Sequence, residues 1–136
     1  MNNDEILIIQ NYLRDIFDNE DISVRKDQDI PPTASIFISS EAIGSLQKDD
    51  DQDEEDISYS LTIPIDYSIT DKENLESNIQ SLSKKKKIII SDRGSIDDSK
   101  EVLILNENAE EEFIGVVFRD NDASCTFSMS ILDFDL

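Results

Sequence analysis

The feature that most constrains the fold is an alternating stretch that begins at residue 57. Every second residue in it is apolar: Ile57, Tyr59, Leu61, Ile63, Ile65 and Tyr67. Successive side chains of a strand point to opposite faces, so this pattern predicts a long strand over residues 57–69 with one buried face. Pro64 falls on the polar parity, and because proline has no N–H to donate, it predicts an edge position or a bulge.

The flanking segments predict a mixed fold. Apolar residues recur at helical spacing over residues 4–18 and indicate an amphipathic helix. Thr70 and Glu73 have the spacing of a capping box and predict a second helix, with the run Lys84–Lys87 in its last turn. Further strands are expected at 22–26, at 33–43, and from residue 88 to the end of the chain. We recognise no internal repeat and expect one α+β domain over residues 1–136, with two amphipathic helices packed on a largely antiparallel sheet.

An acidic run precedes the alternating strand. Its carboxylates are Asp49, Asp50, Asp51, Asp53, Glu54, Glu55 and Asp56. A Ca²⁺ loop of the EF-hand type needs a glycine at its sixth position and a glutamate at its twelfth, and no frame of the run supplies both. Because a block of like charges repels itself, we expect a mobile, solvated loop at about residues 47–56 that acts through its charge, with weak cation binding as the alternative.

Composition excludes several function classes. The formal net charge is −20, which disfavours binding to nucleic acid or to anionic membranes and favours a basic partner. The chain has no histidine and one cysteine, so His-based catalysis and Cys/His zinc sites are excluded. No glycine-rich phosphate loop occurs. We therefore expect no enzyme activity, no catalytic residues, no cofactor and no metal, and Cys125 is expected to be a small strand residue.

The order of predicted elements resembles that of tailed-phage tail terminator or tail-completion (neck) proteins. The resemblance rests on the helix "DEILIIQNYLRDIFD", the strand "ISVRK", the turn "DIPP", and the strand "ISYSLTIPIDYSI" running into the helix "DKENLESNIQSLSKKKK". It implies a virion structural protein, assembled in the host cytoplasm, whose ring, typically a hexamer, joins tail tube and neck or connector proteins. DNA would pass through the ring without specific binding, and no membrane would be involved. Candidate interface residues are Tyr59, Tyr67, Phe127 and Phe134.

Two other classes of protein fit the acidic composition. Type III secretion chaperones are small acidic α+β dimers that hold an unfolded effector segment. They differ from this chain in having a helix near the C-terminus, where this sequence alternates as a strand does. An acidic immunity or inhibitor protein is the third interpretation, since its charge would complement a basic toxin.

Overall fold

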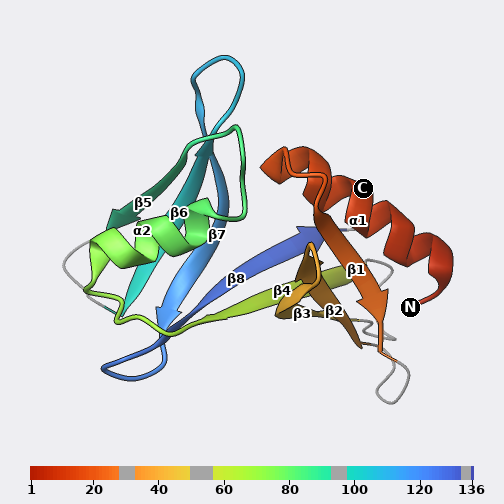
Figure 1. The fold of residues 1–136 in the computed structure, drawn as a ribbon, viewed down its shortest axis with the longest axis horizontal. Coiled ribbons are helices and arrows are strands. Elements are labelled where there is room, and N and C mark those ends of the chain that lie inside the picture. Colours follow the sequence, from red (N-terminus) through yellow and green to blue (C-terminus); the bar gives the residue numbers. More distant parts are fainter. Residues whose placement is uncertain (28–32, 50–56, 93–97, 133–135) are drawn as a thin grey trace. The chain divides into compact units, whose positions relative to one another are not determined.

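A computed structural model describes residues 1–27, 33–49, 57–92, 98–132 and 136 (Figure 1). The chain divides into two compact units. Unit 1 consists of Met1–Thr62 and Ser130–Leu136, and unit 2 consists of Ile63–Met129. The boundary therefore falls inside two strands, so that the last strand of each half of the sequence contributes residues to both units.

Unit 1 begins with one helix and continues with strands. Its elements are α1 (Asn3–Phe17), β1 (Ile22–Lys26), β2 (Thr33–Ile38), β3 (Glu41–Asp49) and the first part of β4 (Ser58–Ile65). Helix α1 starts at a capping box in which Asn2 and Glu5 bond to each other's backbone N–H groups, and it ends at Phe17, followed by the C-cap Asp18 with a left-handed backbone. The buried side of α1 packs against β1, and the apolar residues on alternate positions of the strands complete this core.

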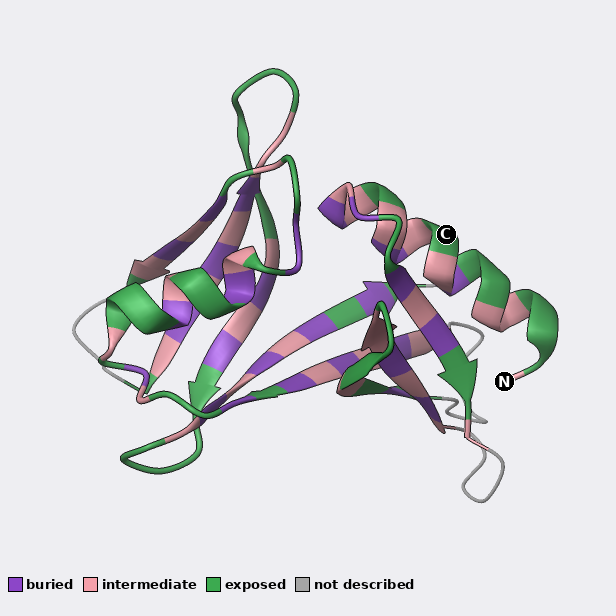
Figure 2. Cartoon of the chain, viewed as in Figure 1, coloured by how far each residue is buried: buried purple, intermediate pink, exposed green. Residues whose placement is uncertain are grey.

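Unit 2 has the same succession of elements. They are α2 (Lys72–Gln80), β5 (Ile88–Asp92), β6 (Ser99–Leu105), β7 (Glu111–Arg119) and most of β8 (Cys125–Leu132). Helix α2 buries Leu75 and Ile79 and packs against β5. Along β6 buried and half-buried residues alternate, which Figure 2 shows as bands on the strand. In each unit we call the sheet face that carries the fully buried residues the inner face, and the opposite one the outer face.

The two units are a repeat, contrary to the expectation from the sequence. Each contains one helix followed by four strands, and the sheet order is β1-β2-β3-β4-β8-β7-β6-β5, which reads the same from either edge when β5–β8 are equated with β1–β4. The strand registers agree residue by residue. Ile22 pairs with Ile38 as Ile88 pairs with Ile104, and Leu46 pairs with Leu61 as Val117 pairs with Phe127.

A shared β-bulge supports the same equivalence. In unit 1 Ile36 pairs with Gly44 and Phe37 pairs with Ala42, so Ile43 is left as the extra residue. In unit 2 Val102 pairs with Gly115 and Leu103 pairs with Phe113, so Ile114 is the extra residue. A glycine follows the bulge in both copies. At Gly115 a Cβ would lie 2.5 Å from the carbonyl oxygen of Ser128, so the close approach of β8 requires glycine there.

The predicted fold class is wrong. Of the described residues, 21% are helical and 49% lie in strands, and the structure is a β-rich fold built on an eight-stranded antiparallel sheet rather than a layer of two helices on a sheet. The error has two local causes. The segment taken as one strand over 33–43 is two strands, because the chain turns at Ser39, whose φ is 57°, and β3 continues to Asp49. The second helix was also predicted too long.

The described elements correct three details of the sequence-based prediction. Helix α2 ends at Gln80, so Lys84–Lys87 follow the helix rather than form its last turn. Its N-cap is Asp71 instead of Thr70, and the Asp71 carboxylate accepts a hydrogen bond from the backbone N–H of Asn74. Pro64 lies in β4, which is central in the strand order. It is tolerated because the pairing of β4 with β3 ends at Thr62, two residues earlier.

Candidate functional site

Most of the predicted acidic loop lies outside the described residues. Asp50, Asp51, Asp53, Glu54, Glu55 and Asp56 fall in that part of the chain, as does Phe134. The predicted start of the loop is a strand, since Gln47, Lys48 and Asp49 belong to β3. The carboxylate of Asp49 accepts a hydrogen bond from Ser60 Oγ at 2.6 Å. Asp120 and Thr126 make the equivalent bond in unit 2, also at 2.6 Å, so this contact closes the same strand pair in both copies.

The aromatic residues predicted as an interface do not form one group. Tyr59 and Phe127 lie at buried positions of β4 and β8. Tyr67 is 39% exposed and follows β4. Tyr59 and Phe127 are therefore core residues of their units, and of the three described residues only Tyr67 presents a sizeable surface to solvent.

A charged cluster fixes α1 to the inner face of unit 1. The Glu5 carboxylate accepts a hydrogen bond from Tyr59 Oη at 2.7 Å and pairs with Lys48 Nζ at 2.9 Å. Burial by itself would raise the pKa of Glu5, but the bonds from Lys48 and Tyr59 outweigh it and lower the pKa to about 2. Glu5 is thus ionised and connects α1 to the two strands β3 and β4. Its role is to stabilise the packing of α1 on the strands. An ionised carboxylate that already accepts these bonds is a poor proton-transfer group.

Cys125 occupies the position in unit 2 that Tyr59 occupies in unit 1, because Arg119 pairs with Cys125 as Lys48 pairs with Tyr59. Its thiol is buried and lies 3.4 Å from the carbonyl oxygen of Tyr67, to which it donates. Burial, with a smaller contribution from Asp120, raises the pKa of the Cys125 thiol to about 11. The thiol is therefore protonated at neutral pH, which makes it unsuited to nucleophilic catalysis.

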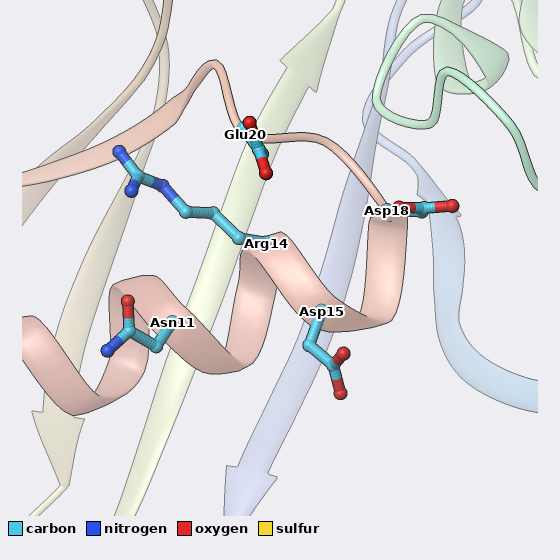
Figure 3. Close-up of a pocket in the computed structure, with 5 residues that line it drawn as sticks. All are labelled: Asn11, Arg14, Asp15, Asp18 and Glu20. Atoms are coloured by element: carbon cyan, nitrogen blue, oxygen red, sulfur yellow. The ribbon is translucent and has the colours of Figure 1, made fainter.

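A polar depression lies at the C-terminal end of α1. It is lined by Asn11, Arg14, Asp15, Asp18 and Glu20, and in Figure 3 the three carboxylates point in different directions instead of converging. Arg14 Nε donates to the carbonyl oxygen of Ile22 at 2.6 Å, so the guanidinium is used to fasten the helix to β1. Nothing in this arrangement selects a ligand. Elsewhere in the described parts of the chain, no group of three or more acidic, Cys or His residues is placed to hold a metal ion.

The described helices are also too short or too polar to cross a membrane.

The features that remain are surfaces, and the outer face of unit 2 is the most distinctive of them. Ile89 pairs with Leu103, and Leu103 pairs with Phe113, which gives an apolar row across three strands. Leu105, Val116 and Phe118 continue the apolar character on the same face. We call these six residues the apolar face: Ile89, Leu103, Leu105, Phe113, Val116 and Phe118.

The apolar face is open to solvent at its largest side chains. Phe113 is 60% exposed and Phe118 is 47% exposed, while the other four residues are partly covered. Phe113 and Phe118 therefore forgo part of the favourable free energy of burial, which is about 2 kcal/mol for a whole phenylalanine side chain. Neighbouring exposed aromatic and aliphatic side chains on one sheet face are typical of a surface that another molecule covers.

Unit 1 provides an internal comparison, because its outer face has the same geometry with different side chains. The residues equivalent to Ile89, Leu103 and Phe113 are Ser23, Phe37 and Ala42. The residues of unit 1 that are equivalent to Val116 and Phe118 are Ser45 and Gln47. The one aromatic residue, Phe37, lies under the guanidinium of Arg25, 4.6 Å from the ring centroid. Apart from Phe37, the outer face of unit 1 is therefore mainly polar, although the Oγ of Ser23 is buried without a hydrogen-bond partner among the described residues.

Sequence reasoning missed the apolar face, although a signal was present. The segments "VLIL" in β6 and "FIGVVF" in β7 are apolar on both parities, whereas "EAIGSLQK" in β3 is apolar mainly on one. Apolar residues on both parities indicate a strand that is covered on both sides. The sequence pattern alone does not show which residues share the outer face, because the bulge at Ile114 changes the parity in the middle of β7. The strand register is needed to assign them.

Comparison with known families agrees with the repeat. A family model described as "Protein of unknown function (DUF3126)" matches residues 5–67 and residues 72–135. The chain belongs to this family. Each matched range contains one helix and the four strands that follow it, from α1 to β4 and from α2 to β8. No match was found among curated proteins or among solved structures.

Proposed function

We propose that the protein is a non-catalytic binding protein that holds a partner protein on the apolar face of unit 2. The observation that carries this proposal is the difference between the two outer faces. The inner faces of both units are largely apolar because each must form a core, and the buried Lys100 of unit 2 is paired with Asp92. An apolar outer face is not required by the fold, since unit 1 has the same strand pairing with serine, alanine and glutamine on it.

The described side chains that could act in catalysis are all engaged in other interactions, which supports a binding role. Glu5 is ionised and bonded, Cys125 is buried and protonated, and Arg14 is bonded to the backbone. A net charge of −20 keeps a protein with exposed aromatic residues soluble and favours a partner of opposite charge. An acidic surface with an apolar centre is suited to binding a protein segment.

Site-specific photo-cross-linking in the native cell tests the proposal. A photoreactive phenylalanine analogue at position 113 is expected to give one discrete adduct, to be identified by mass spectrometry and confirmed with the purified partner. The same analogue at position 42, the equivalent site of unit 1, is the matched control and is expected to give none. Phe118→Gln, which installs the unit 1 residue, should remove the adduct while leaving the circular dichroism spectrum unchanged. Equal adducts from both positions would refute the proposal.

The resemblance to tail terminator proteins stays a prediction. The element order that suggested it has a second explanation, because one helix followed by strands occurs twice through an internal repeat. A six-subunit ring would be visible by mass photometry as a species six times the 15.5 kDa chain mass. The acidic chaperone and the acidic inhibitor both belong to the binding class proposed above, and identification of the cross-linked partner would decide between them.

A further inference from the structure

We propose that the segment held on the apolar face is a basic amphipathic helix, with bulky apolar residues along one side and Lys or Arg residues beside them. This inference rests on the proposed function, since it names the kind of segment that the apolar face binds. It follows from the width of the face, from the way the same sheet packs on its other side, and from the distribution of charge.

The width of the apolar face matches one helix. The row Ile89–Leu103–Phe113 crosses three adjacent strands. Strands lie about 4.8 Å apart, so this row spans about 10 Å, which is the diameter of a helix with its side chains. Val116 and Phe118 lengthen the face along β7 beyond this row. The apolar surface is therefore one helix wide at this row and continues along β7.

The inner face of the same sheet is already covered by a helix. Helix α2 has nine residues, and it buries Leu75 and Ile79, four positions apart, against unit 2. A second helix on the opposite face would complete a layered arrangement in which both sides of the sheet are covered. Addition of a strand at the edge is less favoured, because the N–H of Ile88, at the start of edge strand β5, already donates to Gln80 Oε1 at 2.9 Å.

Charge selects a basic occupant. Among the residues of β5, β6 and β7, the outer face carries Glu101, opposite Val116, and Glu111, opposite Leu105, and no Lys or Arg. Lys or Arg residues beside an apolar stripe would reach Glu111 from the flank of a bound helix, and the net charge of −20 favours the same sign of partner. A second copy of this chain is a poorer occupant, because its net charge is also −20 and the two chains repel each other.

A designed peptide tests this inference directly. The probe is a synthetic helix of about four turns, with leucines at i, i+3, i+4 and i+7 spacing and lysines beside them. One control peptide has glutamates in place of the lysines, and the other has the same composition with the leucines spread around the helix. Fluorescence anisotropy should show binding of the first peptide only, weakened by added salt. Amide shifts in the ¹⁵N spectrum should concentrate in β5, β6 and β7.

Variants that install the unit 1 residues locate the binding. Phe113→Ala, Val116→Ser and Phe118→Gln are each expected to weaken peptide binding at least tenfold, because they remove apolar contact area from the face. Leu7→Gln is the matched control. Leu7 is 54% exposed but lies on α1 in unit 1, so its replacement should leave the affinity unchanged.

The outcomes that differ from these expectations each contradict a specific part of the inference. Equal binding of the glutamate peptide would remove the charge requirement, and equal binding by all variants would place the peptide elsewhere. Self-association in sedimentation experiments that Phe113→Ala abolishes would identify a second copy as the occupant. If the peptides fail while cross-linking from position 113 still yields one discrete partner, the occupant is wrong and the proposed function stands. If both fail, the proposed function fails as well.

Discussion

Unit 1 and unit 2 pair equivalent strands in the same register and share a bulge, yet their outer faces carry opposite kinds of side chain. Where unit 1 has Ser23, Ala42 and Gln47, unit 2 has Ile89, Phe113 and Phe118. The cores differ less, since both inner faces remain largely apolar. This contrast distinguishes the positions that the fold requires to be apolar from the positions at which it tolerates either polar or apolar side chains. The inner face is constrained by packing in both copies, and the outer face is free to acquire a separate use.

The largest effect is expected from breaking the shared framework. Leu61→Ala and Phe127→Ala remove fully buried side chains at equivalent positions, and each should lower the free energy of unfolding by about 3–4 kcal/mol through loss of burial and formation of a cavity. Because β4 and β8 each contribute residues to both units, we expect one cooperative transition in both variants.

Urea unfolding measures this prediction. The chain has no tryptophan, so far-ultraviolet circular dichroism and tyrosine fluorescence are the suitable probes. Coincident curves from the two probes would support joint unfolding of the units. Two separate transitions, with only one of them shifted by each substitution, would show that the repeats are energetically independent.

A smaller effect is expected from a contact of unit 1 that unit 2 replaces. In unit 1 the carboxylate of Glu5 bonds to Lys48 and Tyr59, and in unit 2 the residues equivalent to Lys48 and Tyr59 are Arg119 and Cys125. At neutral pH Glu5→Gln should lower the free energy of unfolding by about 2 kcal/mol, because the folded state lowers the pKa of Glu5 from 4.5 to about 2.

The sign of the pH dependence follows from that lowered pKa. A depressed pKa stabilises the folded state above the unfolded value and loses its effect as the pH falls toward the folded value. The difference between wild type and Glu5→Gln should therefore be constant above about pH 5 and should shrink between pH 4.5 and pH 2. Urea titrations across this range measure it. A difference that does not change with pH would show that the effect arises from packing or from the helix cap.

The smallest effect concerns Cys125, where reactivity rather than stability distinguishes the units. Its buried thiol, with a pKa raised to about 11, should react very slowly with a thiol reagent at pH 8 in the folded protein. In urea the same thiol should react at the rate of an ordinary exposed cysteine. Absorbance at the wavelength of the released thiolate follows the reaction, and rapid modification under native conditions would show that β8 opens readily.

Several local predictions from the sequence are confirmed, and the errors have physical causes. The first helix, the strand at 22–26 and the strand after the acidic run are found with small shifts of their ends, because period and capping residues are local signals. The division of residues 33–49 into β2 and β3 was missed, since a turn at a serine with positive φ leaves no glycine or proline to mark it. The repeat was missed because the two copies preserve positions of burial and pairing more than residue identity.

The candidate site was less predictable than the fold. The aromatic residues chosen as an interface were selected by type, and strand pairing places Tyr59 and Phe127 in the cores. Phe113 and Phe118 were not selected, because membership of the outer face depends on the register with β6 and β8 and on the bulge at Ile114. These are relations between segments distant in sequence, and no local pattern records them.

The tandem repeat has a consequence for valency. Two identical subunits encoded by one gene must change together, so a binding face gained by one would be gained by both, and the assembly would hold two partners. In this chain the two copies are separate stretches of one sequence, and each can be substituted alone. One copy can thus supply the recognition surface while the other remains inert toward the partner. Under the proposed function the expected stoichiometry is one bound segment per chain, which would prevent the protein from bridging two partners into a network.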